Sequence, residues 1–258
     1  MNLRQKIGQK LAVYLARPRK NNIRTTTSKP ELLESTLRKG DVLLVEGSSH
    51  FSTAIKYLTQ STWSHAALCI KDPISRDTGE KNDDILLEVD VSKGVQIINL
   101  SDYWNYHTRI CRPVGLTNDE IDDVINFASK RNGSTYDLKN IFDLARYLIR
   151  TPPVPTSMRR KMLSLGSGDP TKAICSSLIA EAFQSIKYPI LPEIYSNKKN
   201  IDDCDMCHKE YFHIRHHSLY VPRDYDISPY FSIIKPAVEQ GFDYKKITWK
   251  DNIRIDKN

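Results

Sequence analysis

The chain has 258 residues, 40% hydrophobic and 27% charged, with a formal net charge of +7. This composition is typical of a globular protein with ample core, and no stretch approaches the roughly 18 apolar residues of a membrane span. Residues 1–40 hold ten basic and two acidic residues, a net +8 that leaves −1 for residues 41–258, so the near-neutral body argues against a nucleic-acid-binding protein.

Five cysteines form an odd count in a chain too large to need disulfides. They favour free thiols in a reducing compartment. The beginning of the sequence also lacks the continuous apolar region and small-residue cleavage site of a secretory signal. We therefore expect a cytoplasmic location. The cysteines are Cys69, Cys111, Cys175, Cys204 and Cys207.

Residues 1–36 are expected to form a basic amphipathic arm followed by a linker over 18–36. Leucine or isoleucine recurs every four residues from Leu3 to Leu15, as in a short amphipathic helix. Such a helix can dock on the body with its basic face in water, or contact an anionic membrane surface through residues 1–20. A transit peptide is a third interpretation, because acidic residues are absent before Glu31.

The body is expected to span residues 37–235, ahead of a polar tail over 236–258. Short apolar runs predict strands over 41–45, 63–70, 85–91, 94–98 and 106–114. Helical periodicity and capping signals predict helices over 52–59, from Thr117 to Ala128, over 138–150, over 158–165 and from Cys175 onward.

Two polar residues interrupt neighbouring apolar strands. His65 lies in the run 63–70 and Glu88 in the run 85–91. If the strands pair antiparallel with His65 opposite Glu88, residues 71–82 become the connecting loop and the two side chains share one face. A strand histidine is more often a hydrogen-bonded core residue than a base, and a carboxylate among apolar residues often forms a salt bridge. Buried polar groups are nevertheless costly without partners.

Cys175 begins a predicted helix, after a loop rich in Gly, Pro and Ser. A thiol at a helix start meets unpaired N–H groups and the positive end of the dipole, which favour the thiolate. A cysteine there can also simply pack in the core. Together with His65 and Glu88, Cys175 would perform nucleophilic acyl transfer: the thiolate attacks, the imidazole moves the proton and the carboxylate orients the imidazole.

The same residues belong to short motifs that resemble one family. Their order and spacing are similar to the permuted papain-like NlpC/P60 superfamily, in its YiiX/YebB-like (YaeF/YiiX) branch, over roughly residues 37–235. The motifs are Gly40-Asp41-Val42-Leu43, Trp63-Ser64-His65-Ala66, Leu87-Glu88, Gly133 with Tyr136-Asp137, Cys175-Ser176-Ser177-Leu178, and Pro222-Arg223-Asp224 with Ser228-Pro229.

The resemblance implies an α+β fold, with an antiparallel sheet packed against helices and the nucleophile at a helix N-terminus. It implies Cys175 as nucleophile, His65 as base and Glu88 as orienting residue, without a cofactor. It also implies a substrate or oxyanion contact for Tyr136, and Ser64 and Ser176 are further candidates. Family members are regarded as amidases or related cysteine hydrolases, and relatives with this permuted site move acyl chains between lipids.

A second cluster lies in a predicted insertion over 196–217, where Cys204 and Cys207 precede His208 and His213. Two thiolates and two histidines suit tetrahedral zinc, but the spacing is irregular, so a polar loop with free thiols is the favoured interpretation. The C-x-x-C-H pattern of haem attachment would need export.

We expect a cysteine-dependent hydrolase of an amide or ester bond acting on a small-molecule, peptide or lipid-like acyl substrate. Three alternatives remain. The first is a lipid acyltransferase or thioesterase that uses the same site. The second is a membrane-associated binding module that has lost turnover, and the third is a metal-organised interaction protein. The sequence does not indicate an oligomeric state.

Overall fold

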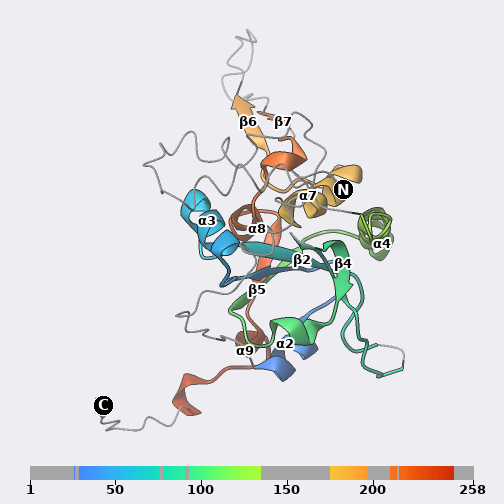
Figure 1. Ribbon diagram of the computed structural model, residues 1–258, viewed down its shortest axis with the longest axis vertical. Helices are drawn as coiled ribbons and strands as arrows, with labels where there is room; N and C mark the ends of the chain where they lie inside the picture. The colour runs from blue at the N-terminus through green and yellow to red at the C-terminus, as the bar shows by residue number, and fades with distance from the viewer. Residues whose placement is uncertain are drawn as a thin grey trace, which may run out of the picture.

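The computed structural model describes residues 26, 29–75, 78–90, 93–134, 175–196, 210–213 and 215–246. A six-stranded antiparallel sheet with the order β4-β3-β2-β1-β5-β8 lies at its centre (Figure 1). The expected α+β fold, with an antiparallel sheet packed against helices, is thereby confirmed. The strands are β1 (Val42–Val45), β2 (His65–Cys69), β3 (Leu86–Asp90), β4 (Gly94–Ile98), β5 (Thr108–Pro113) and β8 (Phe231–Ile234).

Helices cover both faces of the sheet. In Figure 1, α4 and α7 lie above it and α2 and α9 lie below it. The α-helices are α2 (Pro30–Thr36), α3 (His50–Thr59), α4 (Asn118–Ser129), α7 (Cys175–Ser185), α8 (Pro222–Asp226) and α9 (Pro236–Glu239). The part of the chain that the structure describes also contains the 3-10 helices η1 (Leu100–Tyr103), η2 (His217–Leu219) and η3 (Tyr244–Lys246).

Strand alternation divides the core between the two faces. On β2, Leu68 joins the hydrophobic cluster that contains Phe183 of α7, whereas Ala67 joins the cluster that contains Leu33 of α2. Successive side chains of a strand point to opposite faces, so a strand apolar at nearly every position is buried on both sides. This two-sided burial explains the continuous apolar runs in the sequence.

Helix α2 lies in a segment that was expected to be a linker. Residues 18–36 were predicted to be a linker, but residues 30–36 form a helix that buries Leu33 against the sheet. The predicted tail over 236–258 also begins with structure. Helix α9 buries Pro236, and Gln240 Nε2 lies 3.3 Å from Ser35 Oγ of α2. Residues 30–36 and 236–240 therefore pack with the sheet or with each other. The predicted amphipathic helix over 2–16 lies outside the described residues.

The expected strands and the helices over 52–59 and 117–128 agree with the structure to within a few residues. Thr117 and Glu120 form the predicted capping box, in which each side chain accepts a hydrogen bond from the other's backbone N–H. The predicted helices over 138–150 and 158–165 lie outside the described residues. Within the described residues, no helix is both long and apolar enough to cross a membrane.

Several short elements were not predicted. The edge strand β8 pairs with β5, and β6 (Glu193–Ser196) pairs antiparallel with β7 (Glu210–His213) in a separate two-stranded sheet. These strands have four residues each, too few for a clear period-two pattern. The second sheet overlaps the predicted insertion over 196–217, whose residues 197–209 are not described.

A buried ion pair fixes the beginning of β1. Asp41 is only 1% exposed, and both its carboxylate oxygens accept hydrogen bonds from the Arg112 guanidinium of β5, at 2.8 Å each. The same guanidinium donates to the Thr36 carbonyl at the end of α2. Burial raises the pKa of Asp41 although Arg112 opposes this change. The pair thus joins α2, β1 and β5.

Candidate active site

His65 and Glu88 lie on the neighbouring strands β2 and β3, but not directly opposite one another. Leu68 pairs with Leu87 and Cys69 with Leu86. The predicted register, with His65 opposite Glu88, is therefore wrong by two residues. Because side chains alternate with a period of two, a shift of two residues leaves both on the expected face. The predicted contact is present: His65 Nε2 lies 2.7 Å from Glu88 Oε2.

The Glu88 carboxylate has a hydrogen-bond donor on each oxygen. Tyr103 of η1 donates its hydroxyl to Oε2, the oxygen that His65 also contacts. Gln96 of β4 lies directly opposite Glu88 in the β3–β4 pairing and donates from Nε2 to Oε1 at 2.7 Å. Glu88 itself is only 6% exposed. The carboxylate is thus held between three side chains in a site nearly closed to water.

These contacts favour the charged forms of both partners. Burial alone would raise the pKa of Glu88, but the hydrogen bonds and charge of His65, with the donors Tyr103 and Gln96, lower it from 4.5 to about 2. Burial alone would lower the pKa of His65. The negative charges and hydrogen bonds of Cys175 and Glu88 outweigh burial and raise this pKa well above 6.5. The pair is therefore an imidazolium–carboxylate ion pair at neutral pH.

Cys175 is the first described residue of α7 and is 4% exposed. Its interaction with His65 raises the pKa of the imidazole, so the thiol lies beside the ring that also contacts Glu88. Since Nε2 of His65 faces the carboxylate, the other ring nitrogen, Nδ1, is left for the sulfur. The structure thus brings together the three residues that the sequence placed far apart in the chain.

The first turn of α7 is fixed by residues near α8. Ser176 is fully buried, and its hydroxyl donates to the Tyr220 carbonyl at 2.8 Å. The Tyr225 hydroxyl donates to the Ser176 carbonyl at 2.7 Å. Buried polar groups are costly without such partners, so both bonds favour a single position of this turn. They fix the residue next to Cys175, which lies beside His65 at the start of β2.

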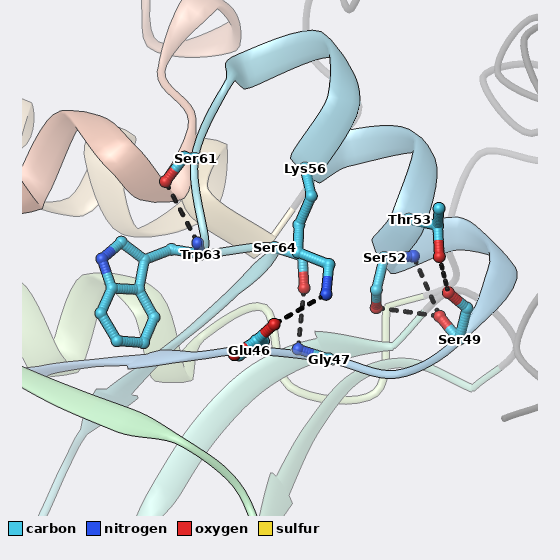
Figure 2. A network of polar contacts seen from close by, with 9 residues as sticks. All are labelled: Glu46, Gly47, Ser49, Ser52, Thr53, Lys56, Ser61, Trp63 and Ser64. Atoms are coloured by element: carbon cyan, nitrogen blue, oxygen red, sulfur yellow. Dashed lines mark hydrogen bonds and ion pairs between the residues drawn. The ribbon is translucent and has the colours of Figure 1, made fainter. Parts of the chain in front are cut away.

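A tight loop follows β1 beside His65, whose partner in the β1–β2 pairing is Val45. Figure 2 shows the Ser64 hydroxyl accepting a hydrogen bond from the Gly47 backbone N–H, at 2.9 Å. In the same view, Ser49 accepts from the Ser52 N–H at the start of α3. Gly47 lies so close to these residues that an added Cβ would be 2.2 Å from Ser52 Oγ and 2.9 Å from Ser64 Oγ.

Gly47→Ala is expected to destabilise the protein by about 1–3 kcal/mol, because the added methyl group overpacks this loop. Urea denaturation of the variant measures the loss. The double variant Gly47→Ala/Ser52→Gly removes the hydroxyl nearest to the new Cβ. In the Ser52→Gly background, Gly47→Ala should cost less stability than it does in the wild-type protein. An equal cost in both backgrounds would show that the contact with Ser52 is not the cause.

The other predicted site residues divide into two groups. The hydroxyls of Ser64 and Ser176 have the protein partners described above, Gly47 N–H and the Tyr220 carbonyl. Their contact with a substrate or oxyanion stays a prediction. Tyr136 lies outside the described residues.

The zinc candidates are not brought together in the described structure. Cys204, Cys207 and His208 lie outside the described residues, and His213 ends β7. Among the residues whose side chains are described, no three His, Cys, Asp or Glu residues are arranged to hold a metal ion. The metal interpretation of the 196–217 segment therefore stays a prediction.

Gln96 and Tyr103 are site residues that the sequence analysis missed. Gln96 is a polar residue inside the apolar strand β4, and only the three residues 91–93 separate β3 from β4. Such a short connection fixes the register, so the pairing of Gln96 with Glu88 was open to prediction. Tyr103 carries no such signal, since it reaches Glu88 from a 3-10 turn outside the sheet.

The lowered pKa of Glu88 predicts a loss of stability in acid. A carboxyl whose pKa is 4.5 when unfolded and about 2 when folded stabilises the protein above about pH 4.5, by about 3 kcal/mol. This stabilisation is lost as the pH falls from about 4.5 towards 2. Urea denaturation at pH 6 and pH 3 should show a smaller acid loss in Glu88→Gln than in the wild-type protein. Equal losses in both proteins would contradict the ion pair.

Comparisons with known proteins bear on this site. Residues 36–147 match the family model described as "Permuted papain-like amidase enzyme, YaeF/YiiX, C92 family". The match includes β1 to β5, and hence His65 and Glu88, and it ends before α7. A search of curated proteins found no match.

A solved structure from Escherichia coli O157:H7, entitled metalloprotein yiiX, is similar to this chain at 14% identity and a TM-score of 0.44. The alignment covers 77% of this chain and 96% of that one. Residues 36–147 of this chain are therefore similar to the permuted papain-like amidase family YaeF/YiiX.

Proposed function

We propose that the protein is a cysteine-dependent hydrolase that cleaves an amide or ester bond through an acyl-enzyme on Cys175. The amidase description of the family supports a hydrolase of this general class. The observation that carries the proposal is the polar chain from Glu88 through the His65 imidazole to the Cys175 sulfur. In this arrangement the thiol has a base, and the base has a carboxylate that orients it.

The reaction has two steps. In the first, the Cys175 thiolate attacks the substrate carbonyl carbon, and the tetrahedral intermediate expels its amine or alcohol, which takes a proton from the His65 imidazolium. In the second, His65 accepts a proton from water as the water attacks the thioester. The intermediate then releases the carboxylic acid product and the Cys175 thiolate, and the proton on His65 restores the starting ion pair.

Glu88 keeps the imidazole in one orientation throughout both steps. Its Oε2 contacts Nε2, so Nδ1 stays directed towards the sulfur. Tyr136, and the Ser64 and Ser176 segments beside the pair and the thiol, are proposed to contact the substrate or its oxyanion. Residues 1–20 are proposed as a peripheral membrane contact, which would bring a lipid-like substrate to the site.

The test is labelling of the purified protein with acyl-amide, thioester and phospholipid probes, followed by peptide mapping. We expect covalent adducts on Cys175. Cys69 and Cys111 serve as internal controls, because burial raises the pKa of both thiols and they should stay unmodified. Product analysis then separates hydrolysis from acyl transfer. A Cys175 that reacts with no probe, and with iodoacetamide no faster than a free cysteine, would contradict the proposal.

A further inference from the structure

We propose that Tyr103 and Gln96 are positioning residues, which together hold the Glu88 carboxylate in the orientation that directs the His65 imidazole at Cys175. This inference rests on the proposed function and assigns two residues to it. Neither side chain needs to touch the substrate, because both act through Glu88.

A carboxylate with one hydrogen-bond partner can rotate about its side-chain bonds. Glu88 is prevented from doing so because its two oxygens are engaged from different elements: Oε1 by Gln96 of β4, and Oε2 by Tyr103 of η1 together with His65. Rotation in either direction would break at least one bond in a buried site, where unsatisfied polar atoms are costly. The two donors therefore determine where the oxygen that faces His65 can lie.

Both donors are themselves fixed by the fold. Gln96 faces Glu88 through the backbone pairing of β3 with β4. Tyr103 ends η1, which is anchored by the buried Leu100 and capped by Asn99, whose side chain accepts from the Ser101 N–H at 2.9 Å. The Tyr103 ring lies edge to face against Tyr106, with ring centroids 5.6 Å apart. Neither residue depends on the substrate for its position.

Tyr103 is suited to act as a donor over the whole working pH range. Burial, and then the charge of Glu88 and the hydrogen bond to it, raise the pKa of Tyr103 well above 10. Its hydroxyl thus stays protonated and directed at the carboxylate. The ring is also close to the imidazole, with centroids of Tyr103 and His65 separated by 6.1 Å. Tyr103 therefore encloses the contact between Glu88 and His65 on one side.

Tyr103→Phe and Gln96→Leu each remove one donor and keep most of the side-chain volume. The first measurement is the rate of iodoacetamide alkylation of Cys175 between pH 5 and 9. We expect a decrease of about tenfold in each variant, because hydrogen bonds to charged groups are among the stronger ones. Matched controls are Tyr188→Phe and Gln184→Leu, whose side chains donate to the backbone carbonyls of Val114, Tyr230 and Arg215. Alkylation in the controls should stay unchanged.

The second measurement is an NMR titration of the His65 imidazole in the same proteins. The pKa of His65 should fall towards its ordinary value in the two positioning variants, because the carboxylate is no longer held against the ring. It should be unchanged in the controls. If Tyr103 and Gln96 only stabilised the fold, all four variants would lose stability, and the pKa of His65 would not fall selectively in the two positioning variants. Gln96 lies on an edge strand and Tyr103 is partly exposed, so each variant provides an independent test.

The two measurements separate this inference from the proposed function. If Cys175 reacts rapidly in the wild-type protein, and neither alkylation nor the His65 titration changes in Tyr103→Phe and Gln96→Leu, the positioning role is overturned and the hydrolase proposal stands. If wild-type Cys175 is inert but the His65 pKa falls in both variants, the hydrolase proposal fails while the two residues still orient Glu88. An unchanged His65 pKa in a protein with inert Cys175 overturns both.

Discussion

Cys175→Ala is expected to abolish turnover and probe labelling at this position, with a decrease of at least about a thousandfold in any measurable activity, because no other group in the proposed mechanism can form the acyl-enzyme. The fold should be retained. The side chain is small, and the first turn of α7 is held by bonds from Ser176 and Tyr225 that do not involve the sulfur. Activity assays with the substrate identified by probe labelling, combined with thermal unfolding, measure both effects.

Glu88→Gln is expected to reduce activity less than Cys175→Ala does. It weakens the orientation of His65 but leaves both the base and the nucleophile, so residual activity is expected where Cys175→Ala has none. Full activity in Cys175→Ala would eliminate the acyl-enzyme. Activity lost equally in both variants would indicate that Glu88 has a role beyond orienting the imidazole.

Arg112→Met is expected to destabilise the protein by about 3–5 kcal/mol at neutral pH, the largest stability effect that we predict. The substitution leaves the buried Asp41 without the two hydrogen bonds that neutralise its charge. It also removes the donor to the Thr36 carbonyl. Urea denaturation at pH 7 measures the loss. Arg131→Met is the matched control, since the pair of Arg131 with Glu181 is about one-third exposed and should contribute about 1 kcal/mol or less.

The pH dependence of this variant identifies the cause. Burial already raises the pKa of Asp41, and removing Arg112 takes away the larger opposing contribution and leaves only that of Arg38. For an acid whose pKa is higher in the folded state, stability decreases as the pH rises from the unfolded pKa towards the folded one. Arg112→Met should therefore be less destabilised, relative to the wild-type protein, at pH 5 than at pH 8. A deficit independent of pH would point to lost packing instead of an unpaired carboxylate.

Part of the site could be predicted from the sequence, because polar residues inside apolar strands are easily recognised. His65 and Glu88 are polar residues within apolar strands, and the two faces of a strand are read directly from its alternation. Their exact pairing could not be predicted. The register with Leu68 opposite Leu87 continues into the connecting segment, where Ile74 and Lys81 form a further bridge. A polar stretch that looked like an open loop is thus partly paired, and this shifts the strands by two residues.

Other parts of the site depend on tertiary contacts that leave no local pattern. Tyr103 reaches Glu88 across 15 positions of the chain, and Tyr225 supports Ser176 across 49. A tyrosine in a turn or a short helix looks the same in the sequence whether its hydroxyl meets water or a buried acceptor. The burial of α2 was missed for a similar reason, because a seven-residue helix is too short to display a full apolar stripe.

The strand order has a consequence for the sequence of events during folding. Strands β1 to β4 lie within residues 42–98, and each pairs antiparallel with the next strand along the chain. Such local connectivity favours rapid assembly, whereas α7 follows more than 60 residues later. The imidazole and its carboxylate can thus be matched to each other before the thiol arrives. Docking of α7 then brings Cys175 to His65 and Glu88, so the proposed reactive centre forms only late in folding.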